Sequence, residues 1–237
     1  MLMTSTNEQD LATHSFILNK IPLTIVDYAG SETPTLVYKD LLKNCYNIEK
    51  IHFLPGDIIL DIGANVGLVC IYIAKRFPFT KVYAFEPIPE NYKHLRTNLK
   101  LNGVKNVVIR NEAITSDGRD FDMIVDLNDN SGGGTGHLKD MKLEGHSFYR
   151  IKSITLDDVF KRYDITHCKL LKIDCEGTEH EILQSTKVLS KVEYLSGEFH
   201  INENLASYGF SINSLTTHCR KFIPRDKLKI SAIRMAE

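Results

Sequence analysis

The chain has no long hydrophobic run and no excess of charge of either sign. No window of its 237 residues approaches the roughly 18 to 20 apolar residues that span a bilayer, so we expect no membrane segment. Its 29 basic and 30 acidic residues give a formal net charge of −1, which argues against a dominant nucleic-acid-binding surface. The polar, acidic start lacks the basic and apolar regions of a secretory signal. We therefore expect a cytoplasmic protein that binds neither membrane nor nucleic acid.

Cysteine patterns that staple small proteins are also missing. The five cysteines are scattered, odd in number and form no C-x-x-C pair, so neither a disulfide framework nor a structural zinc site is expected. The composition, 43% hydrophobic and 25% charged, is that of an ordinary globular protein. The length allows one to two domains at about 150 residues each, enough to bury a full core.

Short apolar runs alternate with helical patterns from residue 57 onward. Helices are expected between these runs, and Pro89 suits the first turn of one of them. The alternation predicts an α/β fold with a mostly parallel sheet and helices on both faces. The expected strands are residues 57–62, 81–86, 107–110, 169–174 and 192–199, with a last strand at 229–234; the expected helices are 66–76, 89–101, 178–189 and 211–222.

Two segments depart from this alternation. Residues 16–26 read as a hairpin and 36–48 as a helix, so we expect residues 1–50 to form an N-terminal extension that caps the active site. Residues 51–237 then form the main domain.

A second hairpin is expected between the third and fourth strands. Its strands, residues 121–125 and 148–154, flank a glycine-rich segment at 126–145. No core can be built from that segment, so we expect a surface loop that closes over the substrate as a lid. A flexible linker between two strands is the alternative.

The strongest local signal is the turn from Asp61 to Gly67, at the carboxyl end of a strand, where open parallel sheets bind ligands. Gly63 allows a sharp turn, and Gly67 lets the helix begin close to the ligand. A dinucleotide fingerprint would need glycines where Asn65 and Leu68 stand. The turn therefore suits pyrophosphate poorly, and its leading carboxylate indicates a ligand with an amine or another cation.

A second acid follows 25 residues later. Glu86 ends the next strand, where an acidic residue binds ribose hydroxyls in this architecture. Asn111, Glu112 and Ala113 end the third strand and could bond the edge of an adenine. Together these features predict S-adenosylmethionine as the cofactor. The alternatives are a helix N-cap for Asp61 and a solvated strand end for Glu86.

At these residues the sequence resembles the FkbM family of methyltransferases over about residues 55–200. The resemblance implies a class I S-adenosylmethionine-dependent (Rossmann-like) fold and, usually, methyl transfer to oxygen in the biosynthesis of natural products or glycans. Such domains also occur inside larger biosynthetic proteins. The motifs that carry the resemblance are Asp61 to Gly67, Phe85-Glu86-Pro87, the helix with Leu95 and Asn98, Ile154 to Asp157, and Lys172 to Gly177.

Two carboxylates are the first candidates for the transfer chemistry. Asp174 and Glu176 end the fourth strand, beside the expected methionine end of the cofactor, which Asp174 is also expected to contact. Thr178 and Glu181 have the spacing of a capping box for the next helix. The alternative is that the two acids are stabilised by the helix dipole and have no catalytic role.

Two histidines could act on the acceptor. Glu198 and His200 lie on one face of the fifth strand, and His200 has the ordinary pKa of a base near neutral pH. His137, in the glycine-rich segment, could close over the acceptor. Both could instead be ordinary surface or core histidines. Asp174, Glu176 and His200 could alternatively hold Mg²⁺ or Ca²⁺, but the family does not clearly require a metal and we expect none.

The resulting hypothesis is a methyltransferase that acts on a hydroxyl or carboxylate of a small natural product, peptide or sugar. One alternative is an NAD-dependent oxidoreductase, which shares the sheet but is disfavoured by Asn65 and Leu68. The other is a non-catalytic cofactor-binding domain of a larger biosynthetic protein.

Overall fold

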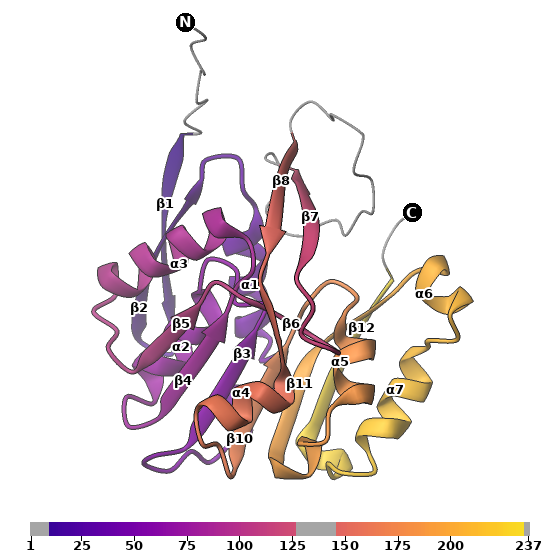
Figure 1. Ribbon diagram of the computed structural model, residues 1–237. Helices are drawn as coiled ribbons and strands as arrows, with labels where there is room; N and C mark the ends of the chain where they lie inside the picture. Colours follow the sequence, from indigo (N-terminus) through magenta and orange to yellow (C-terminus); the bar gives the residue numbers. More distant parts are fainter. Residues whose placement is uncertain (1–9, 127–145, 235–237) are drawn as a thin grey trace, which may run out of the picture.

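A six-stranded sheet forms the centre of the protein (Figure 1). The structure, a computed structural model, describes residues 10–126 and 146–234. The strand order is β12-β11-β10-β3-β4-β5, and every neighbouring pair is parallel, which confirms the predicted α/β class. The strands are β3 (Ile58–Ile62), β4 (Lys81–Phe85), β5 (Val107–Arg110), β10 (Cys168–Ile173), β11 (Val192–Ile201) and β12 (Leu228–Arg234).

Helices cover both faces of this sheet because its buried side chains alternate between two apolar clusters. Ile59 and Leu170 pack with α2 and α3, whereas Leu60 and Leu171 pack with α4, α5 and α7. The predicted helix at 178–189 is shorter than expected, because α5 ends at Ser185. The helices are α2 (Leu68–Arg76), α3 (Pro89–Leu101), α4 (Leu156–Arg162), α5 (Glu179–Ser185), α6 (Glu203–Ser207) and α7 (Ile212–Cys219). None in the described ranges is long and apolar enough to cross a membrane.

The N-terminal residues form the predicted hairpin, β1 (Leu11–Leu18) and β2 (Ile21–Tyr28), followed by α1 (Thr33–Leu42). Two asparagines of the α3 region fasten the hairpin. Asn98 accepts a hydrogen bond from Val26 N at 2.8 Å and donates to Val26 O at 3.0 Å. Asn102 pairs in the same way with the backbone of Thr24. The helix begins and ends earlier than the predicted 36–48.

The insertion between β5 and β10 contains two small strand pairs. β7 (Phe121–Asp126) and β8 (His146–Ile151) form the predicted antiparallel hairpin, which rises above the sheet in Figure 1. The predicted strand at 148–154 is in fact two strands, because β9 (Ser153–Thr155) separates from β8 and pairs with β6 (Ala113–Thr115). The glycine-rich segment and His137 lie outside the described residues.

Candidate functional site

A cavity of about 410 Å³ lies at the carboxyl ends of the parallel strands. Its size falls within the range of roughly 300–1,000 Å³ that is usual for small-molecule sites. The turns after β3, β4 and β10 form its base, and residues of α1, β6, β11 and β12 complete its wall. The lining includes eight predicted site residues: Gly63, Asn65, Gly67, Glu86, Glu112, Ala113, Asp174 and Glu176.

The glycines after β3 are required by packing. Gly63 has φ 75°, and a Cβ there would lie 1.7 Å from the carbonyl oxygen of Asp174. Gly67 has φ 96°, and its Cβ would lie 2.3 Å from Leu95 Cδ1. Asn65 also adopts positive φ, at 49°. The glycine pattern thus lets the turn lie directly against the end of β10 and against α3.

Glu86 is held by the same turn. Its carboxylate accepts hydrogen bonds from Asn65 N at 2.8 Å and Ile88 N at 2.9 Å, while Asn111 donates its side-chain amide to the carbonyl oxygens of Glu86 and Pro87. Burial raises the pKa of Glu86 to about 7, although the two backbone N–H groups oppose this shift. Each carboxylate oxygen keeps acceptor capacity, so the geometry is compatible with the predicted binding of hydroxyl groups. Asn111, by contrast, is occupied in shaping the turn.

Glu112 and Ala113 follow β5 and line the cavity, as predicted. The Glu112 carboxylate accepts a hydrogen bond from Arg162 Nη1 at 2.5 Å, so it is anchored by α4. Arg162 thus fixes the orientation of Glu112, whose contact with the edge of an adenine stays a prediction.

Asp61 lies beneath the turn and not on the cavity wall. It is fully buried, and its Oδ1 lies 3.1 Å from Nζ of Lys172. Lys172 Nζ also donates to Gly63 O at 2.6 Å and lies 3.8 Å from Asp174 Oδ2. Burial would lower the pKa of Lys172, but the two aspartates outweigh it and raise that pKa, so the amine stays protonated. The direct contact predicted between Asp61 and a cofactor amine is therefore replaced by an internal ion pair.

Lys172 is a cavity residue that the sequence analysis missed. It belongs to the quoted motif but received no role. The available signal was a lysine in the apolar run 169–174, a strand of a sheet that was expected to be covered on both faces. Lysine is almost never buried without a partner, so its position indicated a buried carboxylate nearby.

The turn after β10 brings Asp174 and Glu176 to the cavity wall, as expected. Glu176 adopts φ 53°, and Gly177 follows at φ 108°. Burial, and then the charge of Asp174, raise the pKa of Glu176 to about 7, whereas His200 opposes this rise. The environment of Glu176 therefore favours the neutral form of its carboxyl group.

The predicted capping box between Thr178 and Glu181 is wrong. Thr178 has helical dihedral angles and its side chain caps nothing; its hydroxyl donates to Cys175 O. Glu181 instead accepts a hydrogen bond from Ser116. Glu179 satisfies the N–H groups of the turn, because its carboxylate accepts hydrogen bonds from Cys175 N at 2.7 Å and from Gly177 N at 3.0 Å.

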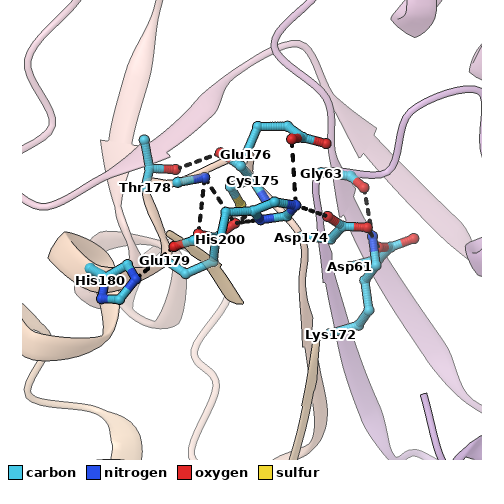
Figure 2. Close-up of polar contacts among 11 residues, drawn as sticks. Asp61, Gly63, Lys172, Asp174, Cys175, Glu176, Thr178, Glu179, His180 and His200 are labelled. Carbon is cyan, nitrogen blue, oxygen red and sulfur yellow. Dashed lines mark hydrogen bonds and ion pairs between the residues drawn. The ribbon is translucent and has the colours of Figure 1, made fainter. Parts of the chain in front are cut away.

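His200 is buried behind this turn and does not line the cavity. Figure 2 shows its ring between Glu179 on one side and Asp174 and Glu176 on the other. Nδ1 lies 3.0 Å from Glu179 Oε1, and Nε2 lies 3.4 Å from Glu176 Oε2. Burial alone would lower the pKa of His200. The charges of Glu179, Glu176 and Asp174 outweigh burial and raise this pKa to about 9. The imidazole is protonated at neutral pH, which argues against the predicted role as a base.

Glu198 completes the cluster and was given no role from sequence, although its place on the same strand face as His200 was apparent. It lines the cavity, and burial, followed by the charges of Asp174 and Asp40, raises its pKa to about 7. The sequence analysis also named no individual residue of the N-terminal extension as part of the site. The wall includes Thr33, Pro34, Leu36, Val37, Asp40 and Tyr46.

Comparison with known proteins agrees with this site. The model of the methyltransferase FkbM domain matches residues 61–222. 31-O-demethyl-FK506 methyltransferase FkbM of Streptomyces tacrolimicus is 26% identical over 186 residues, which cover 67% of this chain and 70% of that protein. AMB antimetabolite synthetase AmbE of Pseudomonas aeruginosa is 27% identical over 215 residues, covering 76% of this chain and 10% of the synthetase.

The chain is also similar to solved structures. Trm5b of Pyrococcus abyssi has 17% identity and a TM-score of 0.44, covering 90% of this chain and 48% of that one. The chain thus spans between a tenth and 70% of the length of the two curated relatives.

The residues around the cavity fit S-adenosylmethionine, the cofactor of this family. Glu86 presents a buried carboxylate with spare acceptor capacity, and the acids after β10 suit a ligand that carries positive charge. The matched region contains every turn at the base of the cavity and selects methyl transfer over the oxidoreductase alternative. The chain belongs to the FkbM family of S-adenosylmethionine-dependent methyltransferases.

Proposed function

We propose that the chain methylates a hydroxyl oxygen of a small, largely apolar biosynthetic product. The charge of the cavity wall carries this proposal. Of the described lining residues, Lys172 is the one with a cationic side chain, and it is bound to Asp61 and Gly63. An acceptor carboxylate would therefore face like charges without a partner, whereas a hydroxyl would not. The carboxylates that an acceptor would face on the cavity wall are those of Asp40, Asp174, Glu176 and Glu198.

The cavity wall also has apolar residues beside these carboxylates. Pro34, Leu36 and Val37 of α1 and Ile233 of β12 contribute to it. An acceptor with an apolar body would bury surface against these side chains. One relative is named for an FK506 derivative and another as an antimetabolite synthetase, which supports a biosynthetic product as the acceptor.

The chemistry requires alignment and removal of one proton. S-adenosylmethionine supplies a methyl group on a sulfonium, and the C–S bonding pair stays with sulfur. The acceptor oxygen uses a lone pair for the new C–O bond, and its proton passes to a base. Asp174 and Glu176 are at the wall, and we assign proton acceptance to Glu176 because Lys172 also contacts Asp174. Alignment by the walls contributes several kcal/mol.

Mass spectrometry with a deuteromethyl-labelled donor tests the reaction. The chain is incubated with a cell extract, and labelled products are then treated with mild alkali. An ether keeps the label, whereas an ester formed from a carboxylate loses it. We expect alkali-stable label, and we expect Glu176→Gln to reduce its formation while still binding S-adenosylhomocysteine. Alkali-labile label would contradict the hydroxyl acceptor, and cofactor binding without labelled product would favour the non-catalytic domain.

We further propose that the N-terminal extension, residues 1–50, selects the acceptor. Val37 lines the cavity from α1, and Leu42, on the same helix, is 55% exposed and lies outside the lining. Val37→Trp should reduce labelled product and leave affinity for S-adenosylhomocysteine unchanged. Leu42→Trp is the matched control and should alter neither. Equal effects of the two changes on product would contradict a role in selection.

A further inference from the structure

Three potential metal ligands converge at the ends of β10 and β11. Asp174, Glu198 and His200 each offer one ligand atom, and these atoms all lie within 4.8 Å of one another. Ligands bound at about 2.1 Å to one ion lie roughly 3 to 4 Å apart, so small side-chain movements would bring the three together. Asp174 and Glu198 lie on the cavity wall, and His200 approaches from the buried side.

The imidazole of His200 is already oriented. Its Nδ1 lies 3.0 Å from Oε1 of Glu179, which is fully buried and fixed by backbone N–H groups of the turn. The residue is only 3% exposed, and Nε2 lies 3.4 Å from Glu176 Oε2 and 4.0 Å from Asp174 Oδ1 (Figure 2). A cation that binds Nε2 displaces the imidazole proton to solvent and takes the place of the ion pair with Glu176. A carboxylate on one ring nitrogen commonly orients a histidine whose other nitrogen binds a metal.

Charge also favours a cation here. The buried cluster brings together more carboxylates than cationic side chains, of which it has Lys172 and His200. S-adenosylmethionine adds one net positive charge, so negative charge remains in excess. Uncompensated carboxylates in a buried site are costly, and a divalent ion would offset them. The carboxylates are those of Asp61, Asp174, Glu176, Glu179 and Glu198.

We propose that Asp174, Glu198 and His200 form a binding site for a divalent cation, with Glu179 as the positioning residue. Two carboxylates and one imidazole suit Mn²⁺ or Zn²⁺, which accept both ligand types, better than Mg²⁺ or Ca²⁺, which favour oxygen. This site replaces the arrangement considered from sequence, in which Glu176 stood in the place of Glu198.

The cation gives the proposed hydroxyl transfer a defined acceptor class, and this part of the inference rests on that proposed function. Three protein ligands leave coordination positions open. An acceptor with two adjacent oxygens, such as a vicinal diol or a hydroxy ketone, could occupy them. Coordination lowers the pKa of a bound hydroxyl, whose proton passes to Glu176 as its oxygen forms the new bond to the methyl carbon.

Calorimetric titration with Mn²⁺, and separately with Zn²⁺, tests the site in the chelator-treated chain. We expect one ion per chain, and at least tenfold weaker binding in Glu198→Gln, because loss of even an outer partner commonly costs 10- to 100-fold. Glu193→Gln is the matched control, since Glu193 lies at the other end of β11 and pairs with Lys169, Lys227 and His167. It should bind the ion as the unaltered chain does.

Binding of S-adenosylhomocysteine is measured in every variant and confirms that each is folded. Equal ion affinity in the unaltered chain and Glu198→Gln would overturn the site. Absence of binding by both ions in a chain that still binds S-adenosylhomocysteine would also overturn it, and would leave the acidic wall to a cationic group of the acceptor. Neither result would affect the proposed methyl transfer, which the labelled-product experiment tests separately.

Discussion

Strands β10 and β11 carry a charged cluster at each end, and the two clusters are balanced differently. At the amino end, Glu193 lies within 3.1 Å of nitrogen atoms of Lys169, Lys227 and His167. Although burial alone would raise the pKa of Glu193, these partners lower it to about 2. At the carboxyl end, acids outnumber cations, and burial raises the pKa values of Glu176 and Glu198 to about 7.

The difference shows that the excess of acid is local. At the amino end, where no ligand is expected, Glu193 is paired with two lysines and a histidine. At the carboxyl ends of the two strands, beside the cavity, the carboxylates have fewer lysine or histidine partners than Glu193 has. Perturbed acids in a cleft are typical of binding and catalytic sites, and stability is lost there in favour of a ligand that completes the balance.

Removal of the buried cation should have the largest effect. Lys172→Met leaves Asp61 buried without its partner, and breaking a buried ion pair from one side typically costs about 3–5 kcal/mol. We expect a loss of this size in the free energy of unfolding, measured with urea. Lys227→Met, at the amino end, is the control and should cost much less, because its side chain is 30% exposed, against 3% for Lys172, and Glu193 keeps two other partners.

A second substitution isolates the pair. In the double variant Asp61→Asn with Lys172→Met, the uncompensated charge is gone, so part of the lost stability should return. If the double variant is destabilised by the sum of the two single changes, the pair does not account for the loss.

Gly63→Ala should disturb the carboxyl end through the backbone. Positive φ costs alanine roughly 1–2 kcal/mol, and the new Cβ would overlap the carbonyl of Asp174, which adds about 1–3 kcal/mol of strain. Gly103→Ala has the same kind of dihedral, at φ 65°, but meets nothing within 4 Å. Thermal unfolding should therefore show a larger loss for Gly63→Ala. Binding of S-adenosylhomocysteine should be lost only in that variant, and equal losses in both would refute the packing argument.

The sequence was sufficient to predict the fold and the part of the site that follows β3, β4 and β5. Apolar runs and the glycine turn located β3, β4 and β5 within a residue or two, because these signals are local. Glu86 directly follows β4 and Glu112 lies two residues after β5, so both reach the cavity at the carboxyl ends of the strands.

The charged part of the site, at the carboxyl ends of β10 and β11, depends on residue pairs that no local spacing in the sequence encodes. Asp61 and Lys172 meet because β3 and β10 are neighbours in a particular register, and His200 meets Glu179 across the start of α5. An isolated histidine on a strand therefore looked like a neutral base. Its buried carboxylate partner, which reverses that interpretation, is visible only in the fold.

Glu86 offers a third kind of balance, a buried carboxylate held by neutral N–H groups. Its pKa of about 7 means that it becomes protonated as the pH falls below neutrality, and a protonated carboxyl is a weaker acceptor for ribose hydroxyls. Affinity for S-adenosylhomocysteine, measured by calorimetry, should weaken from pH 8 to pH 6. Glu86→Gln should bind at least tenfold more weakly, about 1.4 kcal/mol, without this pH response. Glu112→Gln should retain the response; its loss there would assign the titration elsewhere.

The amino-end cluster should give the smallest effect, with a defined dependence on pH. The folded pKa of Glu193 lies below its ordinary value of 4.5, so its ionised form stabilises the fold fully above that value and loses this contribution as the pH falls toward about 2. Glu193→Gln should therefore lower the melting temperature slightly at pH 7, and less at about pH 3.5 or in high salt. A difference that grows in acid would contradict this. Glu198→Gln, the same change at the carboxyl end of the strand, removes one of several unbalanced carboxylates, so the ligand-free chain should be at least as stable as the unaltered one.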